Sequence, residues 1–344
     1  MINKNILHVG PFFEGSTVVH RHNALSKTFT LCHSFNTNSY LPTFKRGLHS
    51  IWRKLCWGPP IRKLNKDLIL IVSKYKPQLI FFEKSLYIYP STLKLIKEMD
   101  ITIIHFSTDD QFNPNNQTKF YLNSINLYDL HLTTKSYNVI ELYQRGAKLV
   151  YFVNNATDGS IFKPIINEDL TNQYKCDVGF IGTWEKERAE SILFLAKNGI
   201  KVKVWGPGWK NKRSLIHPNI LLENKYLIGQ EYIYAINATK INLNFLRKEN
   251  RDLQTTRSIE IPACKAFMLA EFSDEHANLF QENIEAVFFR DNNDLLLKVS
   301  YYLENDYLRN AISENGFNRC TKSNYFYYNL YLSLFNKLIV EDLI

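Results

Sequence analysis

At 344 residues the chain is long for a single hydrophobic core, so two domains of ordinary size are expected. Hydrophobic residues make up 45% of the chain and aromatic residues 14%, a composition that excludes a disordered or fibrous protein. The net charge is +9, and residues 1–150 carry all of the excess, with 19 Lys and Arg against 9 Asp and Glu.

Two further features indicate a cytoplasmic protein. The N-terminal sequence MINKNILHVG has too short an apolar run for a secretory signal, and no segment is apolar for long enough to span a membrane. The cysteines are odd in number and widely spread, without a CxxC pair for a metal or redox centre, which is typical of a reducing compartment: Cys32, Cys56, Cys176, Cys264 and Cys320.

Strands alternate with helices through the first half. The runs NILHVG, PQLIFFE, ITIIHFS, YDLHLTT and KLVYFVN are predicted strands. Between them VVHRHNALSK, PSTLKLIKEM and KSYNVIELYQRGA are predicted helices, the second with a proline near its start and the third ending at a glycine. This rhythm is typical of βαβ units in a parallel sheet.

A polar segment, NNATDGSIFKPIINEDLTNQYK, is the predicted linker. After it CDVGFIG, IKVKVWG, KINLNFL and AFMLAE are predicted strands, KERAESILFLAKNG a helix, and the chain ends in two helices and an aromatic tail. We therefore predict an α/β fold of two doubly wound Rossmann-like domains facing a central cleft. Residues 1–160 form the N-terminal domain, 174–322 the C-terminal domain, and 323–344 a C-terminal helix that packs back toward the N-terminal domain.

The second half also carries a family resemblance. DVGFIGTWEKERAESILFL, VWGPGW, KINLNF, TRSIEIPACKAFMLAE, LFQENIEAVFF and YYLENDYLRNAISENG, between Asp177 and Gly316, resemble in order and spacing the C-terminal domain of the CgeB-like (spore maturation protein) glycosyltransferases. GPFFEGSTVVHRHNAL, STDDQF and YDLHLTTKSYNVIELYQRGAK extend the resemblance more loosely into the first half. The resemblance implies a GT-B fold, with a nucleotide-sugar on the C-terminal domain and the acceptor on the N-terminal one.

The stretch NRDLQTTRSIEIPACKAFMLAE contains the predicted centre of the donor site. Thr255 and Thr256 can cap a helix, whose free N–H groups would face a diphosphate. Arg257 is unfavourable in a first helical turn unless an anion is present, and Glu260 aligns with the family's ribose-binding acid. The alternative is an ordinary surface ion-pair set of Asp252, Arg257 and Glu260.

Other residues are weaker donor-site candidates. They include Gly182, Thr183 and Arg188. A predicted strand ends at Gly182 and a helix follows, and such a turn leaves backbone N–H groups open to a phosphate or sugar. Trp205 and Gly206 can form an aromatic wall and a turn, although packing explains the tryptophan equally well. The family usually has glycine at the position of Lys265, so we expect an altered loop or an added cation there. No DxD pair follows an apolar strand in this half, so we predict a metal-independent reaction and no cofactor beyond the donor, a UDP-, GDP- or dTDP-sugar.

In the N-terminal domain the candidates follow the predicted strands. Gly15 and Ser16 lie in the loop after the first strand, on the donor side of the cleft in the family. His20, Glu83 and Asp109 are candidate general bases, since the last two lie at carboxyl ends of strands, where ligands collect. A helix-start role for His20 and a loop cap for Asp109 are the alternatives. A retaining enzyme would need no such base.

Much of the positive charge lies in Phe44–Lys76, where nine basic residues accompany one acid, Asp67, and two tryptophans. Such a stretch predicts peripheral contact with an anionic membrane, at the inner face, or with an acidic ligand; the alternative is a solvated surface with buried tryptophans. No nucleic-acid partner is expected, because no recognition motif appears.

The predicted function is a hexosyltransferase-like enzyme that transfers a sugar from a nucleotide-sugar to a glycan, lipid-linked or protein acceptor, in surface polysaccharide or glycoconjugate synthesis. One alternative is a GT-B-fold sugar-nucleotide epimerase, which needs two acids flanking the sugar ring. The other is a non-catalytic basic protein that binds a membrane surface or a nucleic acid.

Overall fold

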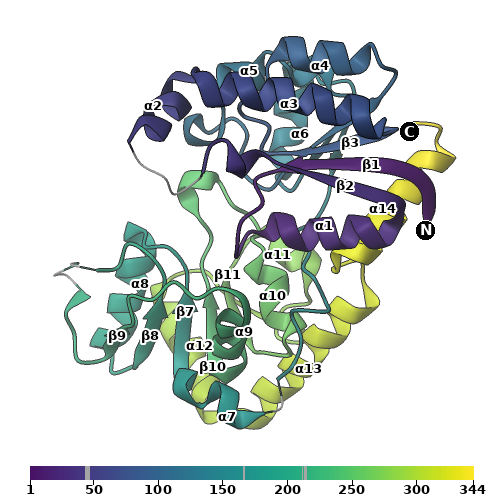
Figure 1. Ribbon diagram of the computed structural model, residues 1–344. Helices are drawn as coiled ribbons and strands as arrows, with labels where there is room; N and C mark the ends of the chain where they lie inside the picture. Colours follow the sequence, from purple (N-terminus) through teal and green to yellow (C-terminus); the bar gives the residue numbers. More distant parts are fainter. Residues whose placement is uncertain (43–46, 166, 211, 213–214) are drawn as a thin grey trace. The chain divides into compact units, whose positions relative to one another are not determined.

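The computed structural model describes residues 1–42, 47–165, 167–210, 212 and 215–344, and it divides into two compact units (Figure 1). Unit 1 comprises Met1–Asn154 and Tyr327–Ile344, and unit 2 comprises Asn155–Phe326. Each unit contains one six-stranded parallel sheet with helices packed around it. The βαβ rhythm of the sequence is therefore present in both halves.

The sheet of unit 1 has the strand order β2-β1-β3-β4-β5-β6. Its central strands are almost wholly buried, as continuous apolar runs predict for a parallel sheet covered on both faces. The order changes direction between β1 and β3, which makes that position the switch point of the sheet. The strands are β1 (Ile2–Gly10), β2 (Phe29–Asn36), β3 (Leu79–Glu83), β4 (Thr102–Ser107), β5 (Leu130–Thr133) and β6 (Val150–Phe152).

Seven described α-helices belong to unit 1, and one of them comes from the C-terminus. That helix, α14, packs on α1, and the rings of Phe29 and Phe335 meet there at 4.8 Å between centroids (Figure 1). An aromatic, largely apolar helix thus completes the core of unit 1. The helices are α1 (Thr17–Thr28), α2 (Leu48–Leu55), α3 (Pro59–Tyr75), α4 (Pro90–Lys97), α5 (Lys119–Leu122), α6 (Ser136–Gln144) and α14 (Tyr327–Val340).

The sheet of unit 2 has the order β12-β11-β10-β7-β8-β9, so its switch point lies between β7 and β10. The strands are β7 (Cys176–Ile181), β8 (Val202–Trp205), β9 (Ile220–Leu222), β10 (Thr239–Asn244), β11 (Met268–Glu271) and β12 (Val287–Phe289). The described α-helices are α7 (Glu168–Thr171), α8 (Lys186–Lys197), α9 (Gly229–Ala238), α10 (Arg257–Ala263), α11 (Asp274–Leu279), α12 (Asn292–Glu304) and α13 (Asp306–Lys322).

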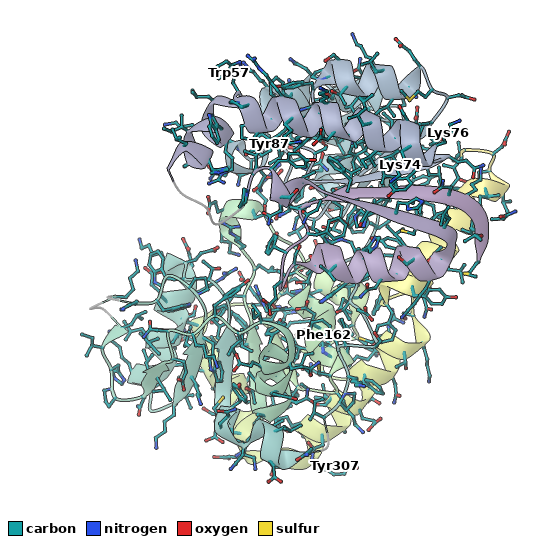
Figure 2. All side chains as sticks on the ribbon, in the orientation of Figure 1. Trp57, Lys74, Lys76, Tyr87, Phe162 and Tyr307 are labelled. Carbon is teal, nitrogen blue, oxygen red and sulfur yellow. The ribbon has the colours of Figure 1, made fainter. Side chains whose placement is uncertain are left out.

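The segment predicted as a linker is largely part of unit 2. The backbone N–H of Asn155 donates to Gln254 Oε1 at 2.8 Å, and Thr157 forms a parallel bridge with Phe326. Phe162, labelled in Figure 2, is buried in a core cluster of unit 2. The polar composition of the segment predicted a linker, because contacts with residues far apart in the sequence leave no local pattern.

Three strands were not predicted. β2 is an edge strand whose exposed and buried positions do not alternate, and β9 and β12 contain three residues each, too few to show a period. Within the described ranges, none of the helices combines the length and the apolar character needed to cross a membrane.

Candidate functional site

Ligands of doubly wound sheets bind outside the carboxyl ends of the strands at the switch point, which in unit 2 means the ends of β7 and β10. The segment after β7 runs through Gly182 and Thr183 into α8, and the segment after β10 runs into α10. Both segments contain predicted donor-site residues, which the parallel pairing of β7 with β10 brings to one edge.

Arg188 and Arg257 both lie at this edge, near the ring of Phe180. The guanidinium carbons lie 5.7 and 6.0 Å from the ring centroid. The Nε of each arginine is buried and has no hydrogen-bond partner among the residues that the structure describes. Arg188 is 4% exposed, and burial together with the charge of Arg257 lowers the pKa of Arg188 to about 10. Two cations held this close repel each other, so the arrangement suits an anion that lies between them.

Glu185 compensates part of this positive charge. Its Oε1 lies 3.5 Å from a terminal nitrogen of Arg188 and accepts a 2.9 Å hydrogen bond from Arg247 Nε. Arg188 also donates to the carbonyl of Thr183 at 3.1 Å, which fixes the turn after β7. Arg188 is thus a buried support for the turn, while Arg257, only partly buried, is the more accessible cation.

The loops after β7 and β8 are tightly bound together. Gly182 N–H donates to the carbonyl of Trp205 at 2.9 Å, and Trp209 Nε1 donates to the carbonyl of Gly182 at 2.8 Å. Gly206 has φ +132°, and a Cβ there would lie 2.2 Å from the carbonyl oxygen of Gly182. Gly182 and Gly206 therefore allow two backbones to approach closely. Because the backbone N–H of Gly182 is bonded to the carbonyl of Trp205, the prediction that this N–H is open to a phosphate or sugar is wrong.

The predicted aromatic wall at Trp205 is wrong. Trp205 is 2% exposed and packs in the core of unit 2 with Tyr174 and Leu227. A ring buried to that extent has no open face for a nucleotide base. The alternative, that Trp205 serves in packing, is correct; the sequence could not distinguish it from an aromatic wall.

The predicted threonine caps are also not formed. Thr256 occupies the N-cap position of α10 but makes no capping hydrogen bond with its side chain, and α10 is only 7 residues long. Thr255 donates its N–H to Ser258 Oγ at 3.0 Å and its hydroxyl to Asn244 Oδ1 at 3.3 Å. Ser258 Oγ is in turn 2.7 Å from His276 Nε2, so these hydroxyls belong to a buried network that holds α10 in place.

Glu260 is 5% exposed and accepts a 2.7 Å hydrogen bond from the hydroxyl of Tyr232 through Oε2. Burial raises the pKa of Glu260, although Tyr232 and the nearby charge of Arg257 oppose that shift. Arg257 and Glu260 are therefore close enough to interact, one turn apart on α10. Tyr232 on α9 is a partner that no sequence motif indicated.

Lys265 follows the end of α10 in a left-handed conformation, with φ +56°. Glycine is favoured at this position after a helix, which is a physical reason for the glycine of the resembling family. The Lys265 ammonium pairs with Glu314 Oε2 on α13 at 2.5 Å. The lysine is thus paired on the surface of unit 2.

In unit 1 the loop after β1 uses Gly15 and Ser16 to start α1. Gly15 has φ +78°, and Ser16 Oγ accepts a 3.3 Å hydrogen bond from the N–H of Val18 as the N-cap. Ser16 Oγ also donates to the carbonyl of Pro11 at 3.3 Å. His20 lies in the first turns of α1 and is partly buried.

Glu83 is not available as a general base. It is 2% exposed at the end of β3, and Arg21 donates to both of its oxygens, at 2.8 and 2.6 Å. His8 Nε2 lies 2.9 Å from Oε1. Burial alone would raise the pKa of Glu83, but the charge of Arg21 and the contact with His8 hold it at about 2, where a carboxylate is a weak base. Glu83 therefore forms a buried ion pair in the core.

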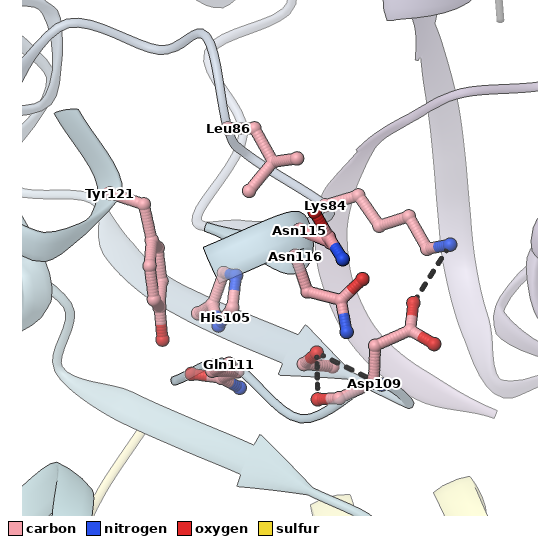
Figure 3. Close-up of a pocket in the computed structure, with 9 residues that line it drawn as sticks. Lys84, Leu86, His105, Asp109, Gln111, Asn115, Asn116 and Tyr121 are labelled. Carbon is pink, nitrogen blue, oxygen red and sulfur yellow. Dashed lines mark hydrogen bonds and ion pairs between the residues drawn. The ribbon is translucent and has the colours of Figure 1, made fainter. Parts of the chain in front are cut away.

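Asp109 lies after β4 at the rim of a pocket with a volume of about 160 Å³ (Figure 3). Its Oδ2 is 2.9 Å from the ammonium of Lys84, which follows β3 in a left-handed conformation with φ +49°. The hydroxyl of Ser107 donates to the Asp109 carbonyl at 3.0 Å. The pocket is lined by Lys84, Leu86, His105, Ser107, Asp109, Gln111, Asn115, Asn116 and Tyr121.

The basic segment contains α2 and α3. Phe44, Lys45 and Arg46 lie outside the described residues, whereas α2 presents apolar side chains that are half exposed or more. Trp57 is exposed as well, as Figure 2 shows, and Arg62 lies 5.0 Å from its ring centroid. The alternative of a solvated surface with buried tryptophans therefore does not describe Trp57, and Trp52 is only partly buried. The exposed apolar residues are Leu48, Ile51, Leu55 and Trp57.

Some residues of the unit 2 site and of the unit 1 pocket could not be identified from the sequence. Phe180 and Tyr232 contact predicted site residues, yet each is a single aromatic residue in an apolar or helical run. His105, Gln111 and Tyr121 line the pocket of unit 1 from β4, the following loop and α5. Only the fold brings these residues together, so no spacing rule could identify them.

Comparison with known proteins agrees with this architecture. A family model described as glycosyl transferase-like matches residues 188–329, a range that begins at Arg188 and includes Arg257 and Glu260. No curated protein sequence matches the chain. The matched range lies in unit 2 except for its last three residues, 327–329, which belong to unit 1.

Solved structures match over nearly the whole chain. Sucrose-phosphate synthase from Thermosynechococcus elongatus has a TM-score of 0.67 at 12% identity, covering 98% of this chain and 100% of that one. Anabaena HepE in complex with UDP and glucose has a TM-score of 0.66 at 10% identity, with the same coverage. A putative UDP-N-acetylglucosamine 2-epimerase from Listeria monocytogenes has 0.59 at 9% identity, covering 98% and 96%. The predicted fold of two parallel-sheet, Rossmann-like domains is confirmed, and it is that of GT-B glycosyltransferase structures.

Proposed function

We propose that the protein is a glycosyltransferase that binds a nucleotide-sugar at the carboxyl edge of unit 2. The observation that carries the proposal is the pair of arginines at the switch point, Arg188 and Arg257, which share the ring of Phe180. A diphosphate there would offset their mutual repulsion and accept charge-assisted hydrogen bonds from Arg257. These cations would also stabilise the leaving diphosphate, which is how a transferase can proceed without a metal ion.

Glu260 is the proposed ribose-binding residue. Tyr232 and Thr256 already hydrogen-bond its carboxylate, and the two oxygens have lone pairs left to accept a further hydrogen bond from a ribose hydroxyl. HepE, which shares the fold, binds UDP and glucose, and this supports a UDP-sugar ahead of a GDP- or dTDP-sugar as the donor. The order of the motifs from Asp177 to Gly316 supports assignment to the CgeB-like transferases, with a hexose as the transferred sugar.

The acceptor is assigned to unit 1. Transfer forms a bond between an acceptor hydroxyl oxygen and the anomeric carbon, breaks the bond from that carbon to the diphosphate, and releases the hydroxyl proton. Asp109 and His20 remain the proposed bases for that proton in an inverting reaction. The acceptor is a glycan, a lipid-linked saccharide or a protein, in surface polysaccharide or glycoconjugate synthesis.

A peripheral contact of unit 1 with an anionic membrane completes the proposal. The exposed apolar side chains of α2 lie at positions i, i+3 and i+7, so they share one face of the helix. One exposed basic residue lies on α2 and others follow on α3, and this combination is typical of helices that lie in a membrane interface. The basic residues are Lys54, Arg62, Lys63 and Lys66.

A thermal-shift panel of UDP-, GDP-, dTDP- and CMP-sugars tests the function. A donor at 100 times its dissociation constant adds about 2.7 kcal/mol to the free energy of unfolding. We expect one nucleotide class to raise the melting temperature, and the failure of all four would contradict the proposal. Product analysis with the bound donor then separates transfer to an acceptor from epimerisation of the donor sugar.

A further inference from the structure

The pocket of unit 1 is lined by buried polar groups that the protein itself does not satisfy. His105, Gln111 and Tyr121 are 2%, 2% and 1% exposed. Nδ1 of His105, both amide atoms of Gln111 and the hydroxyl of Tyr121 have no hydrogen-bond partner among the described residues. Figure 3 shows the three side chains in the same pocket, and the rings of His105 and Tyr121 lie 4.8 Å apart.

Buried polar groups in folded proteins are nearly always paired, so four unpaired atoms on three neighbouring side chains need an explanation. A ligand that both donates and accepts hydrogen bonds would supply it. The pocket is also formed in part by Lys84, whose left-handed backbone is uncommon for a residue with a side chain. Such conformations tend to occur at ligand sites.

The groups that face the pocket indicate a ligand without net charge. Burial and the neighbouring His131 lower the pKa of His105 well below its usual range, and burial raises the pKa of Tyr121 well above its own. Both side chains are therefore neutral near pH 7, as is Gln111. The charges at the rim belong to the ion pair of Lys84 and Asp109, which compensate each other.

The size of the pocket limits the ligand to about one ring. Its volume is about 160 Å³, and a protein cavity of about 150 Å³ is known to accommodate benzene. We propose that the pocket binds one neutral, hydroxyl-bearing six-membered ring, a single pyranose unit, through Gln111, Tyr121 and His105. Its identification as the end of the acceptor glycan rests on the proposed function, whereas the binding itself does not.

The test uses neutral methyl glycosides of glucose, galactose and mannose, titrated into the full chain and followed by ligand-observed NMR. Wild-type protein is expected to bind at least one of them, and the charged analogue glucuronate more weakly. Tyr121→Phe and Gln111→Leu should each weaken binding by about tenfold, the loss expected for one hydrogen bond. The glycoside should raise the melting temperature of the wild type, and this rise should be smaller in the two variants.

Tyr128→Phe is the matched control. Tyr128 is a buried tyrosine beside His105, with 5.1 Å between ring centroids, but it is outside the pocket lining and its hydroxyl lies 2.7 Å from Ser85 Oγ. This variant should bind the glycoside like the wild type. The proposal is overturned if no glycoside binds the wild type, or if the Tyr121 and Gln111 variants bind as tightly; the pocket then holds only water.

UDP-sugar binding, measured on the same samples, separates this inference from the proposed function. Donor binding without glycoside binding is consistent with the proposed function and refutes the pyranose site in the pocket. Glycoside binding without donor binding leaves the pocket standing and refutes the transferase. Arg257→Ala should leave glycoside binding unchanged, because a methyl glycoside has no diphosphate, whereas the Tyr121 and Gln111 variants locate the sugar in unit 1.

Discussion

Glu83 shows how a residue can resemble a general base in the sequence and yet, paired with Arg21, stabilise a core. Glu83→Leu or Arg21→Met alone leaves a buried charge unpaired and should lower the free energy of unfolding by about 3–5 kcal/mol. The double variant should lose less, because it removes both charges. Urea denaturation of the three variants measures the difference, and a double variant that loses the sum of the two would contradict the ion-pair description.

The same pair predicts a loss of stability in acid. The pKa of Glu83 is held at about 2, below its ordinary value of 4.5, so the folded state gains stability from the ionised carboxylate. That stability is fully present above pH 4.5 and is lost as the pH falls toward 2. In the double variant this part of the acid sensitivity should be missing, which urea denaturation at several pH values can detect.

Glu260 predicts the opposite dependence. Burial raises its pKa, so the ionised form costs stability, and the unliganded protein becomes less stable as the pH rises through that raised pKa. Donor affinity should increase over the same range, because the ionised carboxylate is the better acceptor for ribose hydroxyls. Glu260→Gln keeps an acceptor for Tyr232 and should weaken donor binding by about 1.5–3 kcal/mol. Calorimetry across pH should show a flatter profile for Glu260→Gln, and an unchanged profile would refute the ribose role.

At the scale of elements, the close approach of the loops after β7 and β8 depends on the absence of a Cβ at Gly206. Gly206→Ala would bring a Cβ to 2.2 Å from the Gly182 carbonyl oxygen, whereas Gly199→Ala meets nothing within 4 Å. Both glycines have positive φ, +132° at Gly206 and +86° at Gly199, so Gly199→Ala shows the loss from backbone strain where no atom is overlapped. We expect a loss of about 1 kcal/mol for Gly199→Ala and about 3 kcal/mol or more for Gly206→Ala in chemical denaturation. Equal losses would contradict the close approach.

Helix α2 predicts binding to anionic vesicles. Each Lys or Arg near such a surface contributes about 1 kcal/mol, and the attraction fades beyond a Debye length of about 8 Å at physiological salt. Both Lys54→Glu/Arg62→Glu/Lys66→Glu and Ile51→Ser/Leu55→Ser should reduce co-sedimentation with phosphatidylserine vesicles. Leu297→Ser, which changes an exposed leucine of α12, should not. If wild-type protein does not sediment with these vesicles at low salt, the membrane contact is refuted.

The sequence predicted elements where the local pattern was strong. Apolar runs such as PQLIFFE and ITIIHFS gave β3 and β4, and glycine or proline marked several helix ends. The short strand β12 and the edge strand β2 lacked a pattern that distinguishes them from loops. Their positions follow from pairing with neighbours, a long-range effect that local propensity does not contain.

For the whole molecule, the site was less predictable than the fold. Arg188 and Arg257 could be proposed from their places after two strands, and the sheet order brings them to one edge. The predicted roles of Glu83 and of the threonine caps of α10 were wrong, and the two alternatives for Trp205 could not be separated, because a sequence does not show burial or hydrogen-bond partners. The pocket of His105, Gln111 and Tyr121 required three elements to meet, so only the folded chain could reveal it.

The central claim is that a nucleotide-sugar binds unit 2 through Arg257, and calorimetric titration of the donor found in the panel into wild type and Arg257→Ala tests it most directly. We expect Arg257→Ala to lose about 1.5–3 kcal/mol of binding free energy, the scale of a hydrogen bond to a charged group. Lys240→Ala, at the amino end of β10, removes a cation from the opposite edge and should bind normally. Equal donor affinity in wild type and Arg257→Ala would contradict the claim.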